Sequence, residues 1–268
     1  MTAESPPLAT PAPARSLAPR EHGAYGQLGM PLVCGLALGA PSLSGVALAA
    51  GAFAAFFAHE PLLVVLGQRG RRARVEDGPR AMRRLALLGG VAIVLGALGL
   101  ALAPQDARIA ALPPIVLTLG VVWLVWRKEE KTTAGEAIAA TALSGAAMPV
   151  ALACGASWAQ AGLAWLAWSL SFLLATLGVR GVIARNKHQG RQLSNLAIVT
   201  SIVVMAGAVG LWAGGKLPAA VPLGVAPFAV LALAGSLAPV HTKHLRRVGW
   251  GLIAASVATL GVLVATLR

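Results

Sequence analysis

The sequence carries little charge, and acidic residues are especially scarce. Asp, Glu, Lys and Arg make up 12% of its 268 residues, about half of the roughly 25% typical of soluble domains. Nine acids against 22 Lys and Arg residues leave a net charge of +13. A nucleic-acid-binding protein gathers such charge on one surface, whereas here it is divided among short segments between apolar runs. We therefore expect a membrane protein with no nucleic-acid partner.

Cysteine and the motifs of soluble enzymes are also lacking. Cys34 and Cys154 both lie in apolar segments, without a CxxC partner or the spacing of metal ligands. There is no phosphate-binding loop, no HExxH and no dinucleotide-binding fingerprint after a strand. These absences exclude the common soluble enzyme classes, and we expect neither a metal site nor a cofactor.

What the sequence does contain is a series of long apolar runs, since 57% of its residues are hydrophobic. A membrane-spanning helix needs about 20 largely apolar residues, and strands are excluded as spans because an open sheet edge leaves backbone groups unpaired in lipid. The runs lie near 24–40, 46–67, 85–103, 109–126, 136–155, 160–182, 195–213, 219–237 and 249–267. The sequence thus predicts an all-α polytopic membrane bundle of about nine transmembrane helices. We assign it to a single transmembrane domain at 23–268, after a disordered cytoplasmic tail at 1–22 that is rich in Pro and Ala.

The distribution of basic residues orients these spans. With the N-terminus in the cytoplasm, nineteen of the 22 Lys and Arg residues fall on the cytoplasmic side; Arg108, Lys216 and Arg268 fall outside. Cytoplasmic loops collect Lys and Arg, so we predict an inner-membrane protein with its C-terminus outside. All five histidines and eight of the nine acids also lie on the cytoplasmic side. A polar cavity open to the cytoplasm would explain this bias, and short outer loops are the alternative.

Ionisable residues in three segments lie deep enough to suggest function. His59 and Glu60 stand about seven residues, or ~10 Å, from the cytoplasmic end of the second span, where an ionisable residue usually faces a cavity or partner. Pro61 frees a backbone carbonyl one turn back and favours a kink. A hydrogen bond that packs two helices is the alternative role. We take His59 and Glu60 as candidate catalytic residues, with one of them as the acid or base.

The other two segments are rich in basic residues. Arg180 and Arg185 lie five residues apart near the end of the sixth span, where snorkelling to the interface is the alternative. Between the fourth and fifth spans, the stretch WRKEEKTTAGE combines basic and acidic residues with two threonines that we expect to cap the fifth helix. The candidate ligand-binding residues are His22, Arg127, Lys131, Glu136, Arg180, Arg185 and Arg191. We expect Glu136 and Arg180 to line one cavity together with His59 and Glu60.

Several of these segments resemble the UbiA superfamily of intramembrane prenyltransferases. In the first span, REHGAYGQLGMPLVCGLAL has a basic residue ahead of Pro31 and Gly35, as that superfamily does. Further matches are Lys131, Gly135 and Glu136 in the fourth connection, which resemble the menaquinone-pathway branch, and Arg180, Gly190 and Arg191 in the sixth. The resemblance implies a UbiA-like fold of nine helices. It also implies an isoprenoid or lipid phosphate ligand.

The chain departs from that superfamily at both of its Asp-rich motifs, which bind Mg²⁺-diphosphate there. His59 and Glu60 stand at the first motif, and Gly181 and Arg185 replace the aspartates of the second. Mg²⁺ prefers carboxylate oxygens, so we expect function not to depend on Mg²⁺. Arginines would contact the phosphate directly, because guanidinium pairs with it bidentately.

A closer resemblance, over nearly the whole chain, is to the YwiC-like family of bacterial membrane proteins. It is carried by His22-Gly23-Ala24, the HEPLL stretch at 59–63, the basic-Thr-Thr-x-Gly-Glu segment and the closing HLRRVGW. The sequence therefore favours binding or transfer of an amphipathic anionic ligand in a cytoplasm-facing cavity. A proton-coupled or small-solute transporter and a non-catalytic partner of respiratory complexes are the alternatives. The sequence predicts the lipid bilayer as the surroundings and does not indicate an oligomeric state.

Overall fold

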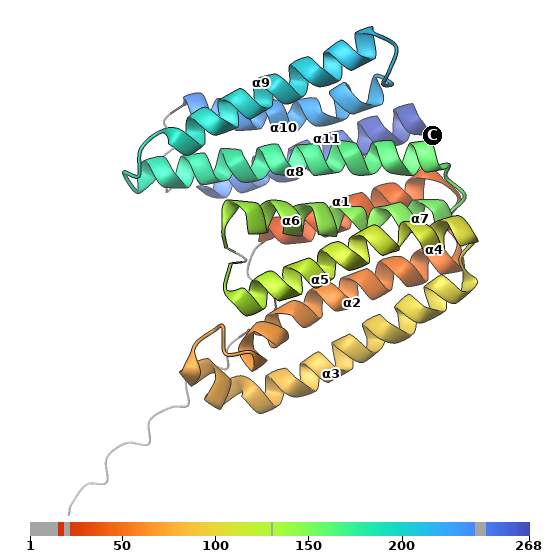
Figure 1. Cartoon of the computed structure of the whole chain (residues 1–268), viewed down its shortest axis with the longest axis vertical. Helices are drawn as coiled ribbons and strands as arrows, with labels where there is room; N and C mark the ends of the chain where they lie inside the picture. The colour runs from red at the N-terminus through yellow and green to blue at the C-terminus, as the bar shows by residue number, and fades with distance from the viewer. Residues whose placement is uncertain (1–15, 19–21, 130, 239–244) are drawn as a thin grey trace, which may run out of the picture.

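The computed structural model describes residues 16–18, 22–129, 131–238 and 245–268, and within these it contains helices and no strand. The helices lie side by side, with α3 at one edge of the row and α9 at the other (Figure 1). They are α1 (His22–Leu38), α2 (Leu43–Val65), α3 (Arg71–Leu102), α4 (Gln105–Ala110), α5 (Leu112–Arg127), α6 (Thr133–Gly145), α7 (Ala147–Ala153), α8 (Trp158–Asn186), α9 (Gln192–Ala213), α10 (Ala220–Leu237) and α11 (Leu245–Leu267).

The expected all-helical membrane fold is confirmed. Among the described residues, eight helical segments are long and apolar enough to cross a membrane, and α1 is a shorter apolar helix beside them. Two of the eight segments are each interrupted once: the first consists of α4 and α5, and the second of α6 and α7. Pro113 and Pro114 lack the N–H donors that would continue the first of these, and Pro149 acts in the same way in the second.

Two expected boundaries differ in the structure. The third span begins at Arg71 rather than near residue 85, because Arg72–Glu76 and Asp77–Arg80 pairs support a helix through this charged stretch. At ~48 Å, a 32-residue helix exceeds the ~30 Å hydrocarbon core, so its charged first turns can extend beyond the lipid. Within the expected tail, Leu17 is buried against Val64 and Ala81, while residues 1–15 and 19–21 lie outside the described chain.

The core lies around α8 and α10. Half of the apolar window of each helix is buried, against 6% for α3. Trp168 stacks on Phe172, which meets Phe228 edge-on. Close backbone approach explains part of the glycine content, since a Cβ at Gly178 would lie 3.0 Å from the Cα of Ala232.

The described connections sort by end as the charge distribution requires. The α2–α3 and α8–α9 connections lie at one end of the helices, and the α9–α10 connection and the C-terminus lie at the opposite end (Figure 1). The basic segments 69–84 and 185–191 therefore share one end of the bundle. We call this the basic end.

The orientation prediction is that the basic end faces the cytoplasm. In a background with the two buried cysteines replaced by alanine, Lys187→Cys should resist a membrane-impermeant thiol reagent in intact cells. Lys216→Cys, at the opposite end, should be labelled without permeabilisation. The reverse pattern would invert the topology.

Candidate functional site

A buried carboxylate–guanidinium pair holds the α2–α3 connection to α2. Glu60 is 1% exposed. Arg69, the fourth residue of that connection, donates from Nε to Oε1 at 2.9 Å and from Nη2 to Oε2 at 2.5 Å. This fork is the strong bidentate geometry of Arg with a carboxylate. Since the Arg69 side chain is 28% exposed, the pair reaches the surface of the bundle.

The pair limits what Glu60 can do chemically. Both carboxylate oxygens accept from Arg69, so an acid or base role for Glu60 requires that the pair open. His59 is half-buried next to it and is also engaged by an interaction partner. The assignment of His59 and Glu60 as catalytic residues stays a prediction.

A second pair, farther along the bundle, joins α8 to α6. Arg180 donates from Nε to Glu136 Oε2 at 2.6 Å and from Nη1 to Thr133 Oγ1 at 3.0 Å, and its Nη2 donates to the backbone carbonyl of Lys131. The side chain of Arg180 is 23% exposed. One guanidinium thus fixes the start of α6 and the α5–α6 connection together.

The two threonines at this helix start have different roles. Thr132 is the N-cap of α6, and its hydroxyl accepts from the backbone N–H of Gly135 at 3.0 Å. Thr133 instead accepts from Arg180. The expected capping is confirmed for Thr132, and Glu136 lies in the first turn, where a negative charge suits the helix dipole.

Arg185 reaches the neighbouring helix end rather than the Arg180 pair. It donates to the backbone carbonyls of Ser236 at 2.8 Å and Ala238 at 2.9 Å, and to that of Gly235. The last carbonyls of a helix have no intrahelical partner, so Arg185 satisfies the end of α10. Its expected ligand contact stays a prediction.

The remaining candidates lie at the surface or outside the description. Arg127 is exposed and stands over the Trp123 ring, 4.7 Å from its centroid, a cation–π geometry. Lys131 and Arg191 are exposed as well. His22 is the first residue of α1, and its side chain lies outside the described part of the chain.

Residues that sequence reasoning missed connect these groups. In the sequence, Arg69 is one of the basic residues expected on the cytoplasmic side, with no individual role assigned to it. Gln68 donates from its side chain to the carbonyl of Val125 at 3.0 Å and so ties the α2–α3 connection to α5. The available signal for Arg69 was a buried acid on α2 followed by a short connection, because a buried carboxylate needs a nearby cation.

The structure brings Glu136 and Arg180 together but keeps Glu60 on Arg69. Among the described residues, no hydrogen bond or ion pair links Glu60 to Glu136 or Arg180. The described residues also contain no group of three His, Cys, Asp or Glu side chains suited to a metal ion. A single cavity lined by His59, Glu60, Glu136 and Arg180 stays a prediction.

The comparison with protein families bears on this arrangement. The family model described as YwiC-like protein matches residues 18–151, which include both Glu60 and Arg69 as well as Glu136. The chain belongs to the YwiC-like family. No curated protein and no solved structure matches it. In this YwiC-like protein, Arg180 lies beyond the matched region.

Loss of Arg69 should destabilise the protein strongly. Arg69→Ala leaves a buried carboxylate unpaired, which typically costs about 3 kcal/mol or more. Glu60→Met combined with Arg69→Met should recover most of that loss. The measurement is unfolding of the purified protein in detergent, with Arg72→Ala as the control, because the exposed Arg72–Glu76 pair should contribute little to stability. Equal losses for Arg69→Ala and Arg72→Ala would contradict a structural role of the buried pair.

Proposed function

We propose that this YwiC-like protein binds an amphipathic anionic ligand, an isoprenoid or lipid phosphate, at the basic end where α5, α6 and α8 meet. The single observation behind the proposal is the placement of Arg180. Its guanidinium is held rigidly by acceptors from α6 and the α5–α6 connection, yet remains partly exposed. A pre-positioned guanidinium at a membrane interface suits a phosphate headgroup whose tail lies in lipid.

The hydrogen-bond capacity of Arg180 supports this reading. A guanidinium has five N–H donors in a fixed fork. Glu136, Thr133 and the Lys131 carbonyl take one each, which leaves two for a ligand. Glu136 alone would repel a phosphate, so the ligand needs further positive charge nearby.

That charge is supplied by the adjoining connections. Lys128 and Lys131 are exposed in the α5–α6 connection. Arg191 lies three residues before Ser194, whose Oγ would be 3.0 Å from a Cβ at Gly181. The start of α9 therefore adjoins the turn of α8 that carries Arg180. These exposed cations favour an anion over a neutral lipid.

The packing of α8 supports contact without a bridging metal. A carboxylate at Gly181, where the UbiA resemblance would put an aspartate, would be tight against Ser194, whose Cα would lie 3.1 Å from the new Cβ. The ligand class itself comes from the UbiA resemblance. That relation, and independence from Mg²⁺, are part of the proposal.

Proton-coupled or small-solute transport is the second candidate, because Glu60 is a buried carboxylate beside His59 and Pro61 on a membrane helix. Intramembrane ionisable residues of this kind mark proton relays in transporters. Opening of the Glu60–Arg69 pair would be the protonation step. Uptake into proteoliposomes that stops on Glu60→Gln, without any bound phosphate lipid, would favour this candidate.

Arg180→Lys should weaken binding of farnesyl phosphate by about tenfold or more, since a lysine keeps the charge but loses the fork, and one bidentate contact is worth about 1.4 kcal/mol or more. The measurement is a titration of protein in lipid nanodiscs with farnesyl phosphate, with farnesol as the uncharged probe. EDTA should leave the affinity unchanged.

Lys216→Ala is the matched control, because Lys216 is an exposed cation at the opposite end of the bundle. Thermal unfolding of each variant checks that the fold is kept. Binding that is equal for Arg180→Lys and wild type, or equal for farnesol and farnesyl phosphate, would reject the proposal. Loss on chelation would reject direct contact by arginine.

A further inference from the structure

The outer face of α3 carries two adjoining hollows of different chemistry. The first, of about 490 Å³, is lined by Arg80, Arg83, Arg84, Leu87 and Leu88. The second, of about 420 Å³, is lined by apolar residues alone: Ala86, Leu87, Gly90, Val91, Val94 and Leu95. Leu87 belongs to both, so a basic hollow continues directly into an apolar one.

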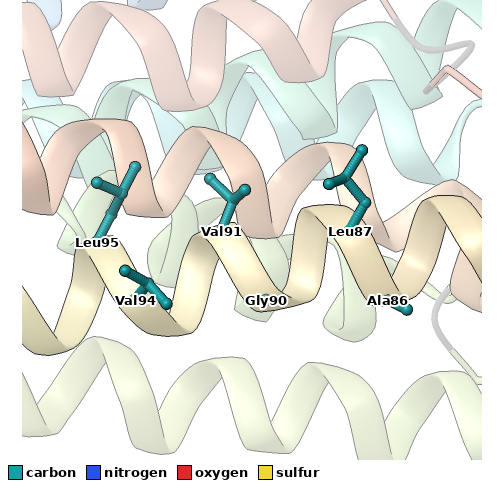
Figure 2. A pocket seen from close by; sticks show the side chains of 6 residues that line it. All are labelled: Ala86, Leu87, Gly90, Val91, Val94 and Leu95. Carbon is teal, nitrogen blue, oxygen red and sulfur yellow. The ribbon is translucent and has the colours of Figure 1, made fainter.

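The sequence positions explain the continuity. The lining residues recur at helical spacing from Arg80 to Leu95, which places them along one side of α3. Leu87, Val91 and Leu95 point to one side of the helix axis, and Gly90 lies between Ala86 and Val94 on the other (Figure 2). From Arg84 to Leu95 the helix rises ~16 Å, about half of the ~30 Å hydrocarbon core.

Two of the three arginines of the basic hollow, Arg83 and Arg84, have donors to spare. Arg80 pairs with Asp77 at 2.9 Å. Arg83 and Arg84 form no hydrogen bond or ion pair with any residue in the described ranges. Within the described part of the chain their guanidinium donors are therefore open to water or to a molecule outside the bundle. Because α3 packs chiefly on α2 and only 6% of its apolar window is buried, that molecule approaches from the lipid side.

We propose that this face of α3 is a binding site for one anionic phospholipid of the cytoplasmic leaflet. Arg83 and Arg84 hold the headgroup phosphate, with Arg80 beside them, and an acyl chain lies along Leu87, Gly90, Val91 and Val94. Phosphate accepts hydrogen bonds from guanidinium donors. The length of the apolar hollow along α3 matches the thickness of one leaflet. The site is separate from the Arg180 site.

Charge argues against the other occupants. A second copy packed through the same face, with parallel helices, would bring the arginines of both copies together without compensating acids. The N-terminal segment 1–21 has two arginines and two acids, Glu4 and Glu21, so its side chains bring no net negative charge to the hollow. An anionic lipid satisfies both the charge and the apolar extension.

The experiment is native mass spectrometry of the full chain titrated with phosphatidylglycerol, and with phosphatidylcholine of identical acyl chains. Wild type should retain one phosphatidylglycerol in preference to phosphatidylcholine. Arg83→Ala combined with Arg84→Ala should weaken that binding about 30-fold, because each interfacial arginine contributes ~1 kcal/mol. Arg72→Ala, which removes an exposed arginine paired with Glu76, should have little effect.

Gly90→Leu tests the apolar half. A Cβ at Gly90 meets nothing within 4 Å, so the leucine fills the hollow without disturbing the bundle. Gly89→Leu is the matched control, since a Cβ at Gly89 also meets nothing within 4 Å and Gly89 does not line the hollow. Gly90→Leu should reduce retention of phosphatidylglycerol severalfold, and Gly89→Leu should not.

Three outcomes would overturn the proposal. They are equal retention of the two lipids, unchanged binding in the double arginine variant, and a dimer that Gly90→Leu dissociates. Arg180→Lys should leave phosphatidylglycerol binding at α3 intact. A failure at one site is thereby distinguished from a failure at the other.

Discussion

Pairing of arginine with a carboxylate near the helix ends is the constraint on which the basic end depends. Glu60 with Arg69, and Glu136 with Arg180, are charges that lipid cannot solvate. Each must find its partner within the protein, so each fixes the position of a connection. Two further side chains hold helix ends by donating to backbone carbonyls. Gln68 donates to the carbonyl of Val125 in α5, and Arg185 donates to the carbonyl of Ser236 at the end of α10.

These contacts divide the basic residues into two groups with different consequences. Arg69, Arg180 and Arg185 are anchored to acceptors of the bundle itself and hold helix ends together. Exposed cations such as Lys128 and Arg191 stand around them with no comparable anchor. The first group gives rigidity, and the second gives an electrostatic surface for anions. A membrane protein with only exposed, unanchored cations would still have the excess of Lys and Arg that orients it in the membrane. It would not hold any guanidinium in a fixed position.

The sequence predicted the helical membrane fold well, because lipid allows so few alternatives for an apolar run of about 20 residues. The breaks at Pro113–Pro114 and near Pro149 had local signals, but a kinked span and a straight one have the same hydropathy. The contacts of the candidate site were harder to predict. Arg180 and Glu136 are 44 residues apart, and only the packing of α6 on α8 brings them together. Glu60 was expected to line a shared site, yet a connection residue, Arg69, occupies both of its oxygens.

The central claim is that Arg180 holds the α5–α6 connection and the start of α6 in place. Hydrogen–deuterium exchange of peptides covering 128–136 tests it most directly, with wild type compared with Arg180→Leu in nanodiscs. The account predicts faster exchange in 128–136 of the variant, because the Lys131 carbonyl, Thr133 and Glu136 all lose their donor. Exchange in α9 should not change. Equal exchange of 128–136 in the two proteins would contradict it.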